Sequence, residues 1–402
     1  MSIETSDIDL NIDIVLKTAR EQNFLRIVPA TDLDSLITAS ILSKNLEEHG
    51  ILCPVNTDPK IILDNVDEPL LVINLPAKDR RNLFELKYNG EFSLASYITH
   101  YLDRVFGVSK WDKIFSIIAG IYRGLDRGRE GFKNIEKEIL DELTKTGYIG
   151  VDLGLKLWGW KNSSLFKAMY RTLIPFIPGY SGDPQRTTGF LKNVLGIDEI
   201  ESIKGEQVLS FDETKIDKTR IFIEKLTQSF ELVDQEYRSK LVLKLIGYVY
   251  TVHDERRVYD IHECLGALEV FSNIDFRNIV YTILLSHDTT ILHQALITYS
   301  RFIDEVSVEI SISIKDSLKK KNSVVEINDL VKRPDIYIDI FESLDLLPDS
   351  RPLIIKNNEI LYTSLREYIR VNKDFEKAYS KCSEYQICMV SENENLLEAH
   401  SI

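Results

Sequence analysis

The first part of the chain alternates between helical and strand patterns. Apolar residues recur at helical spacing from about Asp9 to Gln22, and an apolar strand then runs into an amphipathic helix within Phe24 to Gly50. Two further buried strands are predicted at Ile51 to Val55 and at Leu70 to Leu75. Strands that alternate with helices predict a parallel sheet with right-handed crossovers, so we expect an α/β fold here.

Helical patterns dominate the next part. Helices are predicted at Phe92 to Phe106 and at Lys110 to Tyr122, and the second is nearly all apolar and therefore central. The pattern stays helical from Glu130 to about Asn162, and long helices are predicted from Thr219 to Val252 and from about Asp275 to Ile303.

A cluster of Pro and Gly at Leu173 to Asp183 interrupts these helices before the pattern resumes at Arg186 to Leu195. The fixed φ of its prolines and the conformational freedom of its glycines predict an ordered, irregular loop.

Strand patterns return at the end of the chain. The candidates are Val306 to Ile312, Ser323 to Ile327, Arg351 to Asn357, Glu359 to Leu365 and Tyr385 to Val390. We therefore predict three units: a parallel-sheet α/β domain at 1–205, a helical connecting region at 206–300 and a smaller α/β domain at 301–402.

Composition places the chain among ordinary globular proteins. Of its 402 residues 44% are hydrophobic and 28% charged, and no run approaches the roughly 20 apolar residues of a membrane helix. The first residues lack the pattern of a signal peptide, so we expect a cytoplasmic protein without membrane contact. The four cysteines fit no zinc or redox spacing, so we expect reduced thiols, with Cys382 and Cys388 serving in packing.

The turn after the first strand carries the candidate chemistry. Thr31, Asp32, Asp34 and Ser35 lie there, at the carboxyl edge of the predicted parallel sheet, where ligands and metals usually bind. Asp32 and Asp34 also suit the N-terminus of a helix, where an Asp cap is worth about 1 kcal/mol. Helix capping, residual metal binding and catalysis are the three interpretations of this pair.

The stretch VPATDLDSLITASIL resembles the first motif of the DHH phosphoesterase family, which includes the RecJ exonucleases. The motif has the form His-x-Asp-x-Asp-Gly. Asp32 and Asp34 match its aspartates, whereas Ala30 stands at the histidine and Ser35 at the glycine. In the second motif the strand-ending aspartate is replaced by Asn74, and no Asp-His-His triplet follows.

Other stretches resemble the family in architecture. Ile174 to Ile197 is similar to the Pro-Gly loop and helix of archaeal RecJ-like proteins, and the fourth motif is matched by Gly124, with Asp126 slightly displaced. The last strands resemble the accessory C-terminal domain, with Ser364 and Arg366 at its Ser-x-Arg, but no Gly-Gly-His loop follows.

The resemblance implies a degenerate member of the family. A two-metal phosphodiesterase must hold two cations about 4 Å apart, and neutral Asn74 contributes no charge to that task. The chain resembles the archaeal RecJ-like branch whose members lack nuclease activity, bind the GINS complex and support the MCM replicative helicase within the CMG complex. We expect no cofactor, with weak residual binding of Mn or Mg at Asp32 and Asp34 as the alternative.

Two other functions stay open. One is an active metal-dependent single-strand exonuclease or phosphoesterase that recruits ligands such as Asp103 or Asp126. The other is a DNA-binding module without chemistry, although a net charge of −14 gives no global attraction to phosphate. Candidate weak contacts to single-stranded DNA are Arg123, Arg127, Ser364 and Arg366.

The remaining motifs have structural interpretations. Trp158 and Trp160 are typical of a core or an interface. A solvated face is the main interpretation of the basic residues, which are Arg123, Arg127, Arg129, Lys319 to Lys321, Lys332 and Arg333. His253, His262 and His287, each followed by an acidic residue, lie in segments with helical patterns and are expected to be surface or satisfied histidines.

Overall fold

The computed structural model describes residues 5–64, 67–196, 199–209, 211, 213–230, 235–254, 257–274, 277–286, 289–320, 324–327, 331, 333–344, 346–347 and 352–390.

The N-terminal part is built on a parallel sheet. Strands β1 (Arg26–Pro29), β2 (Leu70–Ile73) and β3 (Leu83–Leu86) pair in the order β1-β2-β3. Its helices are α1 (Thr5–Gln22), α2 (Leu33–Glu48), α3 (Leu94–Val105), α4 (Lys110–Tyr122) and α5 (Asn134–Lys145), and a 3-10 helix η1 spans Pro59–Ile62. The predicted strand at Ile51 to Val55 is reduced to two parallel bridges, formed by Leu52 and Val55 with the segment around β1.

A second, antiparallel sheet replaces part of the predicted helix. It consists of β4 (Ile149–Leu155), β5 (Ile246–Asp254) and β6 (Arg257–Asp260), in that order. The helical predictions for Glu130 to Asn162 and for Thr219 to Val252 are therefore wrong over β4 and β5. The β5 sequence, IGYVYTVHD, is rich in β-branched and aromatic residues. Such residues favour a strand over a helix in a short apolar segment. The β4–β5 pairing also crosses the predicted domain boundary near residue 205.

Helices fill the rest of the middle of the chain. They are α6 (Leu165–Arg171), α7 (Pro184–Leu195), α8 (Gly205–Val208), α9 (Ile216–Gln228), α10 (Gln235–Leu245), α11 (Ile261–Asn273), α12 (Arg277–Ser286) and α13 (Thr289–Lys320). The strand predicted at Val306 to Ile312 is wrong, because this segment lies inside α13. The apolar residues of this segment fit the period of a strand as well as that of a helix. Ile303, Val306 and Ile310 are buried and Ile312 is exposed, as expected when one face of a helix is packed.

The other predicted strands of the C-terminal unit are confirmed. Strands β7 (Val324–Glu326), β8 (Ile354–Asn357), β9 (Ile360–Ser364) and β10 (Ile387–Met389) form a sheet in the order β10-β9-β8-β7. The helices of this unit are α14 (Asp335–Ser343), α15 (Leu365–Asn372) and α16 (Phe375–Lys381). The mixed α/β class with a parallel N-terminal sheet is thus confirmed.

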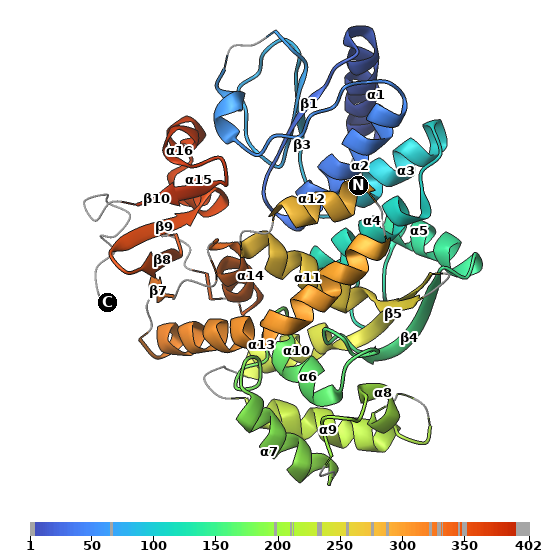
Figure 1. Ribbon diagram of the computed structural model, residues 1–402, viewed down its shortest axis with the longest axis vertical. Coiled ribbons are helices and arrows are strands. Elements are labelled where there is room, and N and C mark those ends of the chain that lie inside the picture. The colour runs from blue at the N-terminus through green and yellow to red at the C-terminus, as the bar shows by residue number, and fades with distance from the viewer. Residues whose placement is uncertain are drawn as a thin grey trace.

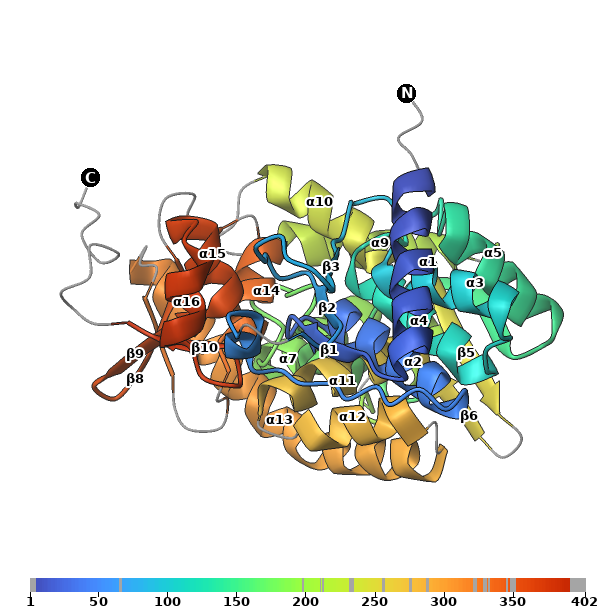
Figure 2. The ribbon, with the colours of Figure 1, turned by 90° about the horizontal axis from the view of Figure 1, so that it is seen from above.

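The N-terminal sheet is covered on both faces. Ile27, Leu71 and Ile73 belong to the large core shared with α2 to α4, while the alternate residues Val28 and Val72 pack in a second core. That second core includes apolar residues of α15, α16 and β10, so the C-terminal unit lies directly against the sheet (Figures 1 and 2). Burial of both faces explains why the sequence around β2 is almost wholly apolar.

The Pro-Gly loop between α6 and α7 is an ordered, irregular loop, as predicted, and most of its residues are buried. The backbone N–H of Ile177 donates to the Ser181 hydroxyl at 2.9 Å, and that of Gly182 donates to the carbonyl of Tyr170 at 2.7 Å. Gly182 has a φ of 66° and lies against the backbone of α13 at Ser307. The loop therefore fixes α13 beside α6.

No helix among the described residues is long and apolar enough to cross a membrane.

Two glycines of this region allow a matched test of packing. A Cβ atom at Gly182 would lie 2.0 Å from the carbonyl oxygen of Ser307, whereas none would be met within 4 Å at Gly189, in the exposed middle of α7. We expect Gly182→Ala to destabilise the protein by about 2–5 kcal/mol, from left-handed strain and overpacking. Gly189→Ala should instead stabilise it by about 0.5–1 kcal/mol. Urea unfolding followed by circular dichroism measures both, and equal effects would contradict the tight contact.

Candidate functional site

Asp32 is the N-cap of α2. Its carboxylate accepts a hydrogen bond from the backbone N–H of Ser35 at 3.1 Å and another from the Ser35 hydroxyl at 2.6 Å. These bonds satisfy one of the free N–H groups in the first turn of the helix. The capping interpretation of Asp32 is therefore confirmed.

Asp34 lies in the first turn of α2 and is fully buried, with 0% of its surface exposed. Its two carboxylate oxygens accept backbone N–H groups of Leu94 at 3.2 Å and Ala95 at 3.0 Å, which belong to the first turn of α3. Asp34 thus caps a second helix, not its own. Burial raises the pKa of Asp34, and the charge of Arg123 opposes that rise without cancelling it.

Arg123, at the C-terminus of α4, joins the two aspartates. Its Nη2 lies 2.5 Å from Oδ1 of Asp32, and its Nε lies 2.8 Å from Oδ2 of Asp34. Burial by itself would lower the pKa of the guanidinium, but the charges of the two aspartates outweigh it and raise that pKa. A charged guanidinium therefore lies between the two carboxylates, in the position where two such groups would otherwise attract a metal cation.

Aromatic rings cover the same guanidinium. Its central carbon lies 4.5 Å from the ring centre of Tyr88 and 5.5 Å from that of Tyr122. Only 17% of the Arg123 side chain is exposed. The combination of paired carboxylates and neighbouring rings is typical of a buried structural arginine.

Asn74 completes the cluster from the end of β2. Its Nδ2 donates to the Ser35 hydroxyl at 2.8 Å, and its Oδ1 accepts the backbone N–H of Tyr88 at 2.7 Å. The Ser35 hydroxyl in turn donates to Asp32. An ionised aspartate at this position has no hydrogen to donate to Ser35, so the amide and the hydroxyl suit each other.

The cluster has the chemistry of an ion pair. Two carboxylates, one guanidinium, one hydroxyl and one amide satisfy one another through the bonds given above. Within the part of the chain that the structure describes, no group of three or more His, Cys, Asp or Glu side chains is arranged to hold a metal ion.

The other acidic candidates have cations of their own. Asp103 pairs with Lys113 at 2.8 Å, and it lies nine residues after Leu94 on α3, which is roughly 13 Å along the helix. Asp126 is buried and pairs with Lys156 at 2.7 Å, while burial raises its pKa. Neither residue joins Asp32 and Asp34.

The nucleic-acid candidates differ in burial and in their partners. Ser364 is buried and caps α15, where its hydroxyl accepts the backbone N–H of Glu367 at 3.3 Å. Arg366 pairs with Asp339 on α14 and lies 4.0 Å from Asp335. Arg127 is exposed in the loop after α4. DNA contact by these residues and by Arg123 stays a prediction.

The other basic and aromatic residues have several environments. Arg129 is exposed and lies over the ring of Phe211. The prediction of a solvated face is wrong for Arg123 and Arg333, because both are held by aspartates and Arg333 is buried against Asp335. Trp158 and Trp160 are core residues, as expected. Lys321 and Lys332 lie outside the described residues, as do the side chains of Lys319 and Lys320.

Two of the three histidine predictions can be compared with the structure. His253 lies on β5, so its helical assignment is wrong, whereas His262 lies on α11. His262 is buried beside Tyr250, and neither ring nitrogen has a hydrogen-bond partner among the residues that the structure describes. Burial lowers its pKa to about 3. It is therefore a neutral core residue, neither exposed nor satisfied. His287 lies outside the described residues.

The prediction for the cysteines is wrong for one pair. Cys382 and Cys388 form a disulfide, while Cys53 and Cys264 are buried free thiols. The spacing of six residues matches no common metal or redox motif, and only the hairpin formed between α16 and β10 brings the two residues opposite each other.

Sequence reasoning missed two residues that build the site. Tyr88 covers Arg123 and bonds Asn74, and Glu136 accepts the backbone N–H of Ser93 at 2.7 Å, at the start of α3. Both come from segments far along the chain, so no local pattern signals them.

Comparisons with known proteins address the family. A family model described as archaeal Cdc45 matches residues 12–375 of this chain. The crystal structure of CDC45 from Entamoeba histolytica is similar to it with a TM-score of 0.53 and 9% sequence identity, over 87% of this chain and 86% of that chain. No curated protein sequence matches significantly.

Structures of RecJ are also similar at lower scores. RecJ from Thermus thermophilus, in complex with Mn²⁺, has a TM-score of 0.37 and 9% identity, over 90% of this chain and 48% of that chain. An exonuclease RecJ bound to manganese has a TM-score of 0.38 and 9% identity, over 94% and 93% of the two chains. The likeness to the Entamoeba structure shows the fold, and the family match confirms the predicted resemblance.

The ion pair predicts the effect of removing Arg123. We expect Arg123→Ala to destabilise the protein by about 3–5 kcal/mol at pH 8, because the buried Asp34 loses its counter-charge. Arg127→Ala removes an exposed arginine four residues away and should change stability by less than about 0.5 kcal/mol. Urea unfolding measures both, and similar small effects would show that Arg123 is not the partner of Asp34.

The Arg123→Ala deficit should also depend on pH. Without the guanidinium, burial raises the folded-state pKa of Asp34 still further above its unfolded value of 3.8. The folded variant then binds more protons than the unfolded chain, so its stability is greatest below that value and is lost as pH rises through the folded pKa. We expect a smaller deficit at pH 5 than at pH 8, by up to about 1.4 kcal/mol per pH unit.

Proposed function

The chain belongs to the archaeal Cdc45 family, and on this premise we propose that it is a DNA replication factor of RecJ-like fold without nuclease activity. It binds the GINS complex and through it supports the MCM replicative helicase. The observation that supports the absence of nuclease activity is the position of the Arg123 guanidinium between Asp32 and Asp34. It gives the two remaining acidic residues of the ancestral motif a permanent cation.

Metal binding at this cluster would have to displace that cation. A divalent ion near Asp32 and Asp34 would face the positive charge of Arg123 at the distance of an ion pair. Asn74, where the family carries an aspartate, adds no compensating charge and is committed to Ser35 and Tyr88. The residues present therefore do not fit a two-metal site, and no hydrolytic step is derived through one.

A protein partner suits the surface better than a nucleic acid does. The net charge of −14 opposes binding to a phosphate backbone, whereas it is neutral toward a protein interface. The C-terminal sheet offers one such surface. Met389 on its edge strand β10 and Ile360 on β9 are 54% and 51% exposed. We propose that GINS binds at this end of the C-terminal sheet.

The absence of nuclease activity is tested with metal and substrate together. We expect the purified protein to leave single-stranded DNA and RNA intact in manganese or magnesium, and its free energy of unfolding to be unchanged by either metal. A working site at a hundredfold excess over its dissociation constant would add about 2.7 kcal/mol. Degradation by the wild type that disappears in the double variant Asp32→Ala, Asp34→Ala would show a live nuclease.

The partner surface is tested with charge substitutions. Met389→Lys and Ile360→Lys should each weaken binding to GINS purified from the same source by about tenfold or more, since a desolvated lysine at an interface costs at least about 1–2 kcal/mol. Ile312→Lys is the control, because Ile312 on α13 is 57% exposed and lies outside the sheet. Titration calorimetry gives the three affinities. Unchanged affinity in both sheet variants would show that GINS binds at another surface. If the wild-type protein does not bind GINS, GINS is not its partner.

A further inference from the structure

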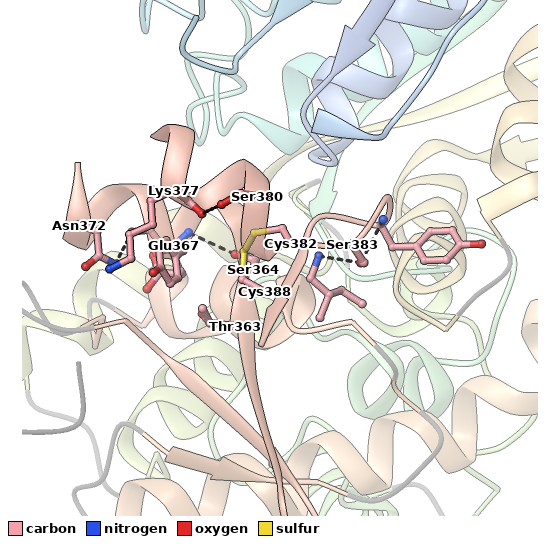
Figure 3. The surroundings of a disulfide bond; sticks show 12 residues. Thr363, Ser364, Glu367, Asn372, Lys377, Ser380, Cys382, Ser383 and Cys388 are labelled. Carbon is pink, nitrogen blue, oxygen red and sulfur yellow. Dashed lines mark hydrogen bonds between the residues drawn. A yellow bond between two sulfur atoms is a disulfide. The ribbon is translucent and has the colours of Figure 1, made fainter. Parts of the chain in front are cut away.

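The disulfide between Cys382 and Cys388 closes a short ring in the C-terminal unit (Figure 3). Cys382 ends α16, and Cys388 lies in the middle of β10. The two residues are 1% and 0% exposed, and both belong to the core that the C-terminal unit shares with the N-terminal sheet. The bond thus lies at the contact between the two units.

Hydrogen bonds around Ser383 fix the backbone inside the ring. The N–H of Ser383 donates to the carbonyl of Ile387 at 2.9 Å, and the Ser383 hydroxyl accepts the N–H groups of Tyr385 at 3.2 Å and of Ile387 at 3.4 Å (Figure 3). The N–H of Gln386 donates to the carbonyl of Ser383 at 2.9 Å. This arrangement holds Gln386 at a φ of 56°, a conformation that side-chain-bearing residues rarely adopt.

Gln386 reaches from the ring to the N-terminal part of the chain. Its Nε2 donates to the carbonyl of Pro29 at 2.8 Å and to that of Thr57 at 3.1 Å. Only 2% of the residue is exposed. Pro29 is the last residue of β1, three positions before Asp32, so the ring is anchored at the edge of the candidate site.

Two further polar contacts of this interface come from α16, the helix that the disulfide ties to β10. The hydroxyl of Tyr379 donates to the carbonyl of Pro76 at 2.5 Å, and Lys78 pairs with Glu376 at 2.5 Å. The second of these pairs is exposed, whereas Gln386 is buried. Because the disulfide joins α16 to the ring, it positions the contacts of α16 and those of Gln386 together.

We propose that this ring is a thiol–disulfide latch between the C-terminal unit and the N-terminal sheet. In the oxidised protein the latch holds Gln386 on Pro29 and Thr57. In the reduced protein the ring is free to leave the left-handed conformation, and the two units separate more often. The inference goes beyond the proposed replication role and does not depend on it.

The chemistry is exchange with a small disulfide. The thiols of Cys382 and Cys388 and one molecule of a disulfide RSSR give the protein disulfide and two molecules of the thiol RSH. One sulfur–sulfur bond breaks, one forms, and the two protons pass to the leaving thiolates. Because both sulfurs are buried, the exchange requires the α16–β10 contact to open first, so the closed latch protects itself from reductants.

The state of the cysteines is measured first. Alkylation of the denatured, unreduced full-length protein should modify two of the four cysteines, Cys53 and Cys264, and alkylation after reduction should modify all four. Mass spectrometry counts them. Four modified cysteines in protein incubated with oxidised glutathione would overturn the proposal.

Docking is measured through the exposed ion pair across the interface. A carbodiimide converts a Lys–carboxylate pair to an amide, so the yield of the Lys78–Glu376 crosslink reports how often the units are together. We expect the ratio of docked to separated protein to fall about tenfold in the double variant Cys382→Ser, Cys388→Ser, and about tenfold in Gln386→Ala, which keeps the disulfide but loses two hydrogen bonds. The Lys137–Asp141 crosslink within α5 serves as the internal standard.

Glu384→Ala is the matched control, because Glu384 lies in the same ring and is exposed. It should leave the Lys78–Glu376 yield at the wild-type value. An unchanged yield in both the double cysteine variant and Gln386→Ala, with the standard also unchanged, would show that the ring does not latch the units.

Discussion

The ion pair of Arg123 with Asp32 and Asp34 organises the N-terminal part of the protein. The guanidinium ties the end of α4 to the turn after β1, and the Asp34 carboxylate extends the connection to the first turn of α3. The guanidinium supplies the positive charge that the two carboxylates require. Because Asp34 is fully buried, the net stability of this cluster depends on the hydrogen bonds that satisfy both the carboxylates and the guanidinium.

The second organising contact is the one between the N-terminal sheet and the C-terminal unit. Val28 and Val72 turn one face of the sheet toward α15 and α16, and Gln386 adds a polar anchor at the end of β1. The C-terminal unit therefore contributes to the core of the N-terminal sheet. Its position restricts what can approach the edge where Asp32 lies, because Gln386 binds the carbonyl of Pro29 three residues away.

The sequence alone predicted those features that depend on neighbouring residues in the chain. The strand before Ala30, the capping role of Asp32 and the helix at Lys110 to Tyr122 all follow from periodicity and cap chemistry. It was insufficient where partners come from far along the chain: Arg123 is about 90 residues from the carboxylates that hold it, and the pairing of β4 with β5 overrode apolar patterns that also fit a helix. The buried His262 and the paired Cys382 and Cys388 are likewise set by tertiary neighbours, which spacing alone does not reveal.

The pairing of β4 with β5 has a consequence for how the chain is made. Leu155 at the end of β4 is opposite Ile246 at the start of β5. The residues between them therefore form one long connection between two strands that pair at seven positions. On a ribosome that adds about 5–20 residues per second, β4 emerges roughly 5–20 s before its partner exists. During that interval the N–H and C=O groups of β4 lack their β5 partners, so closure of the middle sheet is a late step in the folding of this chain.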